Sequence, residues 1–262
     1  MIFKIAILGG CFPVQEQINN EELYHSIIKE KIKKEKNIDT EFVVFRYDTF
    51  RQCKNILDSI DGTDISCILL HIRPDPFLQA VKIYRKYINK ENSRRNNINI
   101  HFTGFSEPEI NPVNFGTVIY RNILDKYFKK QTRRILRNLN YVTGIVIRNN
   151  LITKKIILNT IKEINDFSIR NGIKLVIQGP PMRPRSFLEN TLLKNLGKYI
   201  AKSIDKETGY VPGFFRKDNS GNFIFLEDKI HLNEFGHQYF ANLIYGKLNL
   251  CETDTAILSE LN

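Results

Sequence analysis

The stretch KIAILGGCFPVQEQ, residues 4–17, begins with an apolar run that ends in Gly9-Gly10 and is followed at once by a cysteine. A short run that is apolar throughout, rather than alternating, is typical of a strand buried on both faces of a sheet. The glycine pair marks the turn that leaves this strand. Cys11 therefore stands at the carboxyl end of the first strand, where it is either a small core residue or a nucleophile.

Three further runs of this kind occur along the chain, at 41–45 (EFVVF), 66–72 (SCILLHI) and 173–178 (IKLVIQ). Helical patterns lie between and after them, over 17–36, 50–60, 76–89, 113–139, 151–171, 186–204 and 234–248. Strands that alternate with helices predict an α/β domain with a parallel sheet. We expect a single domain over 1–250, with a helical insertion around 100–150 and a C-terminal tail over 251–262.

The charge balance is basic, with 39 Lys+Arg against 28 Asp+Glu and a net charge of +11. This excess would suit an anionic partner, but general enrichment of the chain in Lys, Ile and Asn is the simpler explanation. Basic residues at near-helical spacing in 125–137 form either a solvated helix face or a docking surface for an acidic partner. No recognition motif accompanies the charge, so we expect no specific nucleic-acid partner.

The four cysteines are Cys11, Cys53, Cys67 and Cys251, and they form neither a CxxC pair nor a zinc-binding spacing. We expect reduced thiols, with the last three in the core or incidental, and no metal or cofactor. The N-terminus lacks the pattern of a signal peptide, and no run approaches the roughly 20 apolar residues of a membrane span. We therefore expect a cytoplasmic protein.

Ligands of parallel α/β proteins bind at the carboxyl ends of the strands, so the residues after each run are the first candidates. HIRPDP (71–76) follows the third run and GPPMRPR (179–185) follows the fourth. Arg73 either attracts an anion or forms a structural ion pair. His71 with Asp75 is also a metal-ligand pattern, but the flanking prolines favour a rigid turn. Arg183 and Arg185 are candidates for the same rim.

The most specific segment is DKIHLNEFGHQYFA, residues 228–241. Asp228 and His231 stand three positions apart on a predicted loop, and Asn233 is a candidate N-cap for the helix that follows. An imidazole at this place is suited to act as a general base, and a carboxylate on its other nitrogen would fix the tautomer. His237 is six positions beyond His231 and is expected on the helix surface.

These landmarks resemble the SGNH (GDSL) hydrolase superfamily, in which the first strand ends in Gly-Asp-Ser and a late Asp-x-x-His motif precedes the last helix. Gly9, Gly10 and Cys11 stand at the three positions of the first motif. The Leu-Asn and Gly-His of the late segment commonly follow the family's histidine, and the GPP at 179–181 resembles a strand end with a Pro pair. The landmarks span nearly the whole chain.

The resemblance implies a flavodoxin-like, three-layer α/β/α fold with a central parallel sheet, and a Cys11–His231–Asp228 triad. The chain departs from the family in two ways. Cysteine replaces the nucleophilic serine, and HIRPDP stands where the family has Gly-x-Asn-Asp, whose Asn donates to the oxyanion. Gly10, Arg73 and His71 are therefore the candidates for oxyanion or substrate contacts.

A thiol at this position favours acyl chemistry through a covalent intermediate. A free thiol has a pKa of about 8.5, which a neighbouring imidazolium or helix N-terminus lowers. We expect an acyl-thioenzyme formed from an ester or thioester, resolved by water or by an acceptor. The substrate would be a small-molecule or carrier-bound acyl compound. The alternative is a catalytically inactive binding protein on the same fold, which the lost Asn block supports and the retained Asp-x-x-His opposes.

Overall fold

The computed structural model describes residues 2–10, 12–47, 50, 52–60, 64–81, 135, 138–139, 141–143, 145–146, 149–184, 186–205, 207–214, 216–217, 220–228 and 230–248. Its centre is a five-stranded sheet in the order β2-β1-β3-β4-β5. The strands are β1 (Ile2–Gly9), β2 (Asp39–Arg46), β3 (Cys67–His71), β4 (Lys174–Gln178) and β5 (Gly209–Val211), and all of the pairings are parallel. This is the flavodoxin-like strand order, as expected.

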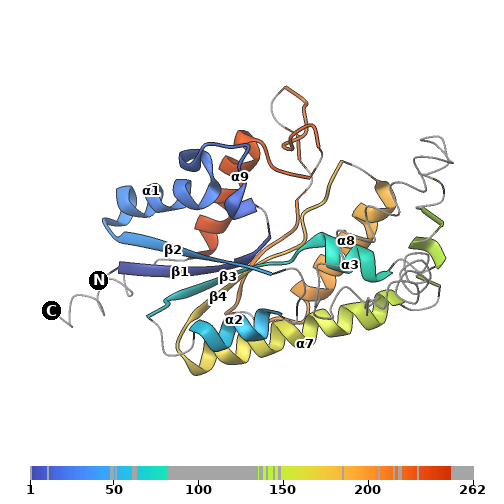
Figure 1. Cartoon of the computed structure of the whole chain (residues 1–262), viewed down its shortest axis with the longest axis horizontal. Coiled ribbons are helices and arrows are strands. Elements are labelled where there is room, and N and C mark those ends of the chain that lie inside the picture. Colours follow the sequence, from blue (N-terminus) through green and yellow to red (C-terminus); the bar gives the residue numbers. More distant parts are fainter. Residues whose placement is uncertain are drawn as a thin grey trace, which may run out of the picture.

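Helices cover both faces of the sheet (Figure 1). One face carries α1 (Tyr24–Lys36) and α9 (Glu234–Leu248), and the other carries α2 (Gln52–Ile60), α3 (Pro74–Val81), α7 (Asn149–Arg170) and α8 (Phe187–Ala201). The expected three-layer α/β/α architecture is therefore confirmed. No helix among the residues described above is long and apolar enough to cross a membrane.

The two layers of the core meet the sheet through alternate residues of each strand. Ile5 and Ile7 of β1 face the cluster under α1 and α9, whereas Ala6 and Leu8 face the cluster under α2, α3, α7 and α8. All four residues are at most 1% exposed. Burial on both faces explains why the strands read as continuous apolar runs rather than as alternating ones.

The elements differ from the expectation in two details. The first helix begins at Tyr24 rather than near residue 17, because short 3₁₀ turns at Phe12–Val14 and Asn20–Glu22 precede it. Strand β5 was not expected, because a three-residue strand that begins with glycine is too short to show a pattern. Most of the predicted insertion around 100–150, and the tail over 251–262, lie outside the described residues.

The start of α9 fixes the loop that precedes it. As expected, Asn233 caps the helix, since its side-chain oxygen accepts a hydrogen bond from the N–H of Gly236 at 2.8 Å. Gly236 lies so close to the 223–225 segment that a Cβ there would collide with the carbonyl oxygen of Ile224. A side chain at position 236 would therefore push the first turn of α9 away from this segment.

We predict that Gly236→Ala lowers the free energy of unfolding by about 1–3 kcal/mol, because the backbone oxygen of Ile224 cannot yield as a flexible side chain would. Gly246→Ala, in the same helix, is the matched control. It meets open space, so helix propensity should raise stability by about 0.5–1 kcal/mol. Urea denaturation of both variants measures the difference, and equal effects of the two substitutions would contradict the close packing of α9.

Candidate active site

The carboxyl ends of the central strands meet at one edge of the sheet. Strand β1 ends at Gly9, next to β3, while His71 of β3 is paired with Gln178 of β4. The backbone continues this register for one more residue, since the N–H of Ile72 donates to the carbonyl of Gln178. The segments after β1, β3 and β4 therefore begin side by side, as a ligand site at this edge requires.

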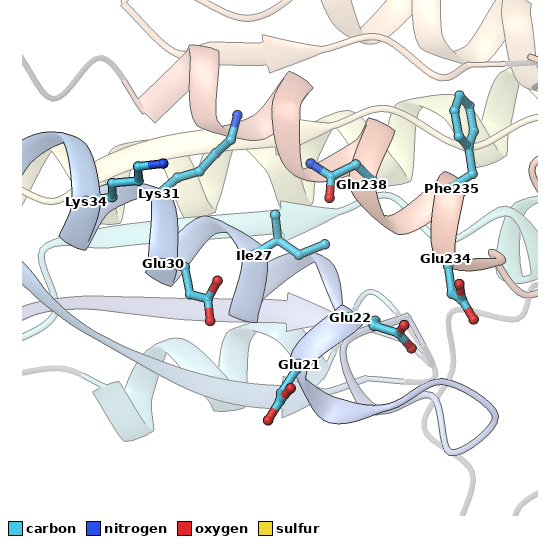
Figure 2. Close-up of a pocket in the computed structure, with 9 residues that line it drawn as sticks. All are labelled: Glu21, Glu22, Ile27, Glu30, Lys31, Lys34, Glu234, Phe235 and Gln238. Atoms are coloured by element: carbon cyan, nitrogen blue, oxygen red, sulfur yellow. The ribbon is translucent and has the colours of Figure 1, made fainter.

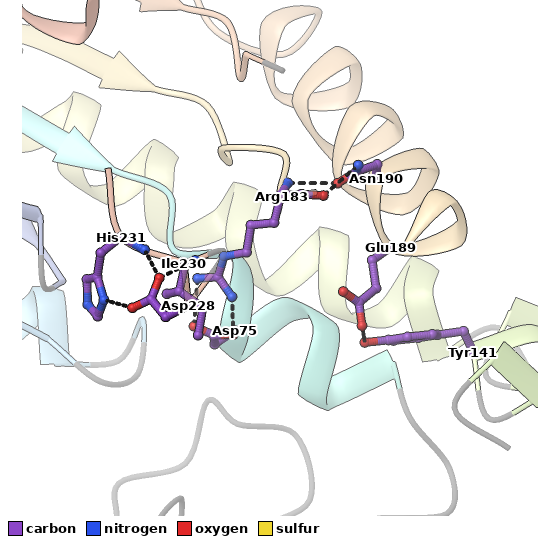
Figure 3. A network of polar contacts seen from close by, with 8 residues as sticks. All are labelled: Asp75, Tyr141, Arg183, Glu189, Asn190, Asp228, Ile230 and His231. Atoms are coloured by element: carbon purple, nitrogen blue, oxygen red, sulfur yellow. Dashed lines mark hydrogen bonds and ion pairs between the residues drawn. The ribbon is translucent and has the colours of Figure 1, made fainter. Parts of the chain in front are cut away.

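Asp228 and His231 form a direct pair on the loop before α9 (Figure 3). The Oδ2 atom of Asp228 lies 2.5 Å from Nδ1 of His231. The other oxygen, Oδ1, accepts hydrogen bonds from the backbone N–H groups of Ile230 at 2.8 Å and His231 at 3.0 Å. One oxygen of the carboxylate thus accepts hydrogen bonds from the backbone of its own loop, and the other contacts the imidazole.

This geometry favours the ionised carboxylate. Burial works to raise the pKa of Asp228, but the hydrogen bonds from the backbone and ring of His231 and from the Ile230 N–H outweigh it, so the pKa lies below the ordinary value. An acceptor at Nδ1 fixes the proton of neutral His231 on that nitrogen. The lone pair of the ring is then on Nε2, which is the arrangement of a general base with its orienting carboxylate.

The turn after β1 is described on both sides of Cys11, but Cys11 itself lies outside the described residues. Gly10 and Phe12 line a small pocket of about 30 Å³ at the sheet edge, together with residues that follow β3 and β4. These are His71, Ile72, Arg73, Pro74, Asp75, Gln178, Pro181 and Arg183. The pocket thus brings together the three predicted contact residues, Gly10, His71 and Arg73.

Arg73 follows β3 directly and lies against the end of β1. A Cβ built on Gly10 would be 2.8 Å from Nε of Arg73. The guanidinium donates to the backbone carbonyl of Tyr47 and lies over the Tyr47 ring, with Cζ 5.7 Å from the centroid. The Tyr47 hydroxyl in turn donates to the carbonyl of His71. Tyr47, which the sequence did not single out, therefore anchors a positive charge beside the turn that precedes Cys11.

His71 lies beneath this edge and is 3% exposed. Its Nε2 is 3.1 Å from the hydroxyl of Tyr24, a buried residue of α1. Burial, followed by the charge of His25, lowers the pKa of His71 to about 3. The ring is therefore neutral at physiological pH, and it can offer a substrate a dipole but no charge.

His237 is not on the helix surface, and that expectation is wrong. It is 0% exposed, because α9 turns this face toward α1 and the segment after β1. Its Nδ1 accepts the backbone N–H of Tyr24 at 3.3 Å, and its Nε2 lies 3.3 Å from Oε1 of Gln15. These contacts join segments more than 200 positions apart, and helical periodicity around His237 alone does not reveal them.

Gln15 is the second residue that the sequence did not single out. It is 3% exposed, and its Nε2 donates to the carbonyl oxygen of Leu232 at 2.7 Å. Leu232 directly follows His231, so this bond ties the segment after Cys11 to the loop that carries the Asp228–His231 pair. Gln15 follows the apolar CFPV stretch (11–14) and begins a polar run with Glu16 and Gln17, so no signal in the sequence indicates that it is buried.

Asp75 is in the first turn of α3, not in a rigid turn, since the helix begins at Pro74. Its carboxylate forms a two-pronged ion pair with Arg183, at 2.8 and 3.0 Å (Figure 3). Arg183 lines the pocket, as expected for the rim, and Arg185 lies outside the described residues. Among the described residues, no group of three His, Cys, Asp or Glu side chains could hold a metal ion.

The two cysteines that the structure describes are unsuited to chemistry. Cys53 and Cys67 are both buried, and burial raises the pKa of each thiol to about 12. This confirms the core assignment of both. Cys251 lies outside the described residues.

A second, larger pocket of about 670 Å³ lies between α1 and α9 (Figure 2). Four glutamates, two lysines, Ile27, Phe235 and Gln238 line it. None of the predicted site residues that the structure describes is among them. Its walls are mostly charged side chains, and Figure 2 shows them spread around an open hollow. The small pocket at the sheet edge is lined by Gly10, His71 and Arg73, whereas the lining of neither pocket includes Asp228 or His231.

We predict a pH signature for His237. Burial lowers its pKa from 6.5 to about 4, with smaller contributions from the charges of His25 and His231. Between these pH values the unfolded chain binds more protons than the folded one, so acidification costs up to about 1.4 kcal/mol per pH unit. His237→Gln should therefore lose less stability than the wild type between pH 7 and pH 5 in urea titrations. Parallel curves would show that folded His237 binds its proton normally.

No family model and no curated protein matches the chain. Among solved structures, it is similar to TesA, with a TM-score of 0.52 and 9% identity over 94% of this chain and 97% of that one. The esterase EstA from Pseudoalteromonas sp. follows, with a TM-score of 0.46, 11% identity and coverage of 94% and 96%. A protein from Desulfitobacterium hafniense DCB-2, assigned to the G-D-S-L family, has a TM-score of 0.44, 8% identity and coverage of 92% and 97%. The similarity to TesA, over almost the whole of both chains, is a similarity of fold.

Proposed function

We propose that this chain is an acyl-transfer enzyme of the SGNH type, which cleaves or transfers an acyl group from an ester or thioester. Cys11 is the proposed nucleophile, His231 the base and Asp228 the residue that orients it. The observation that carries the proposal is the 2.5 Å contact between Asp228 and His231, on a loop tied to the segment after β1. The fold shared with TesA agrees with it.

The proposed reaction has two steps. Nε2 of His231 takes the proton of the Cys11 thiol, and the thiolate attacks the acyl carbonyl to form a tetrahedral intermediate. The intermediate collapses to a thioester on Cys11, and the imidazolium returns its proton to the departing alcohol or thiol. Water or an acceptor then attacks this thioester with His231 again as base, which releases the acyl product and restores the thiol.

Asp228 supports both steps by stabilising the imidazolium that forms in each of them. Its second oxygen is held by two backbone N–H groups. The carboxylate therefore need not reorganise when His231 becomes charged, which is the condition for effective electrostatic catalysis.

Arg73 is the proposed electrophilic contact, in place of the family's Asn. Its side chain packs against Gly10, one residue before Cys11, and Tyr47 holds it there. A guanidinium at this place stabilises the negative charge on the carbonyl oxygen and attracts an anionic group on the substrate. Gly10 contributes through its lack of a side chain, and His71 through a neutral ring beneath the pocket.

The experiment that tests the proposal is intact-protein mass spectrometry with a panel of acyl thioesters and aryl esters. We predict an acyl adduct on the wild type that is lost in Cys11→Ala and forms at least about 10²-fold more slowly in His231→Ala, because the general base is gone. Asp228→Ala should slow the adduct as well. The mass of the adduct identifies the acyl group.

Cys53→Ala is the matched control, since it removes a thiol that is buried and unreactive. It should leave the adduct unchanged. If the wild type forms no adduct and shows no turnover, and Cys11 alkylates no faster than free cysteine at neutral pH, the nucleophile is wrong. The inactive binding protein then becomes the better account.

We predict that Arg73→Met lowers kcat by about 10²–10³-fold, the usual cost of losing one oxyanion contact. Gly10→Ala should lower kcat in the same direction by a smaller factor, because its Cβ would displace the guanidinium while the charge remains. Steady-state kinetics on the best substrate measures both. A change confined to KM in Arg73→Met would instead indicate a contact to an anionic group that is equal in the ground and transition states.

A further inference from the structure

We propose that Gln15 is a positioning residue, which holds the loop of His231 in place relative to the turn after β1. The inference rests on the proposed function, because it assigns Gln15 to the same site. It concerns a residue that does not touch the reacting atoms. Its action runs through the backbone carbonyl of Leu232.

Both the oxygen and the nitrogen of the Gln15 side-chain amide form hydrogen bonds. The neighbouring hydrogen bonds determine which of the two atoms faces which partner. The N–H of Tyr24 donates to Nδ1 of His237, so the proton of the neutral ring is on Nε2. That N–H donates to Oε1 of Gln15 at 3.3 Å, and the Gln15 amide therefore presents Nε2 to the carbonyl of Leu232, at 2.7 Å. Every donor in this series of hydrogen bonds thus faces an acceptor.

The chain of bonds is anchored in the core. Tyr24 is 0% exposed, and its ring stacks on the ring of His237 with an angle of 3° between the planes. Its hydroxyl contacts Nε2 of His71, at the end of β3. The loop of His231 is thus joined through Gln15 to the segment after β1, to helices α1 and α9, and to strand β3.

The backbone of His231 is held from two directions. Its own carbonyl accepts the N–H of Leu226 at 2.8 Å, which closes the loop on itself. The next carbonyl, that of Leu232, accepts from Gln15, which fixes the loop against another part of the molecule. The first bond shapes the loop, whereas the second sets its distance from the turn where Cys11 follows Gly10.

This distance matters for the reaction, because a misplacement of about 1 Å between reacting groups can cost about 10²-fold in rate. A leucine at position 15 has nearly the size of glutamine but neither donates nor accepts. Gln15→Leu therefore removes the link to Leu232 while it keeps the space filled.

The test compares Gln15→Leu with the wild type in two measurements. The first is kcat and KM on the best substrate, for which we expect kcat to fall by about 10–10²-fold while KM changes little. The second is NMR titration of the His231 imidazole in substrate-free protein. We expect its titration curve to depart from that of the wild type, because the loop that carries the ring then lies differently against the turn after β1, although the contact with Asp228 within the loop persists.

Leu57→Ala is the control for a general loss of stability. Leu57 belongs to α2 and packs in the cluster on the opposite face of the sheet. This variant should be destabilised yet keep the wild-type kcat and the wild-type titration of His231. Equal changes in Leu57→Ala and Gln15→Leu would reduce Gln15 to a stabilising residue and overturn the proposal.

The two measurements separate failure of this inference from failure of the proposed function. If the wild type has no activity but the His231 titration still depends on Gln15, the function is wrong and the positioning role stands. If the wild type is active and Gln15→Leu keeps both its kcat and its His231 titration, the positioning role is wrong and the function stands.

Discussion

Strand β1 is the constraint on which the site depends. It pairs with β2 on one side and with β3 on the other, and a hydrophobic cluster covers each of its faces. Any shift of β1 would therefore break the backbone hydrogen bonds to two strands and the packing of two layers. Because the sheet is parallel, fixing β1 also fixes the edge at which β3 and β4 end. The turn at Gly9-Gly10 is therefore set by the core of the protein. The loop that carries His231, by contrast, lies outside the sheet and needs its own attachments.

The parts of the structure that the sequence predicted are those determined by neighbours along the chain. Four strands, the start of α9 and its Asn233 cap depend on local apolar runs and on a local hydrogen bond. The Asp228–His231 pair also closes within four residues, so the short spacing, together with the resemblance to the SGNH motif, predicted the contact. Strand β5 has only Gly209–Val211 and takes its conformation from pairing with β4, which no local pattern reveals.

The contacts that the sequence missed are long-range. His237 shares the buried face of its helix with Phe240 and Ile244, but that spacing does not reveal that Tyr24 and Gln15 contact its ring. Tyr47 likewise gains its role only when β2 and β3 bring it beside Arg73. In each case a polar group is buried against a partner from a distant segment, and the partner's identity depends on the whole fold. The sequence indicated the chemical properties of these residues, but not which distant residue each of them would contact.

The HIRPDP block is sterically linked to a further difference from the SGNH pattern, the glycine at position 10. The family's Asp falls at Gly10, where a Cβ would lie 2.8 Å from Nε and 3.2 Å from Cδ of Arg73. An aspartate at position 10 would require the Arg73 side chain to move from its present place, and its charge would neutralise the guanidinium. Glycine at position 10 admits a cation beside the proposed nucleophile, at the strand end where the family's Asn donates. The missing Gly-x-Asn-Asp block is thus weak support for an inactive protein, because the guanidinium of Arg73, the oxyanion contact proposed above, lies in the space that the glycine leaves.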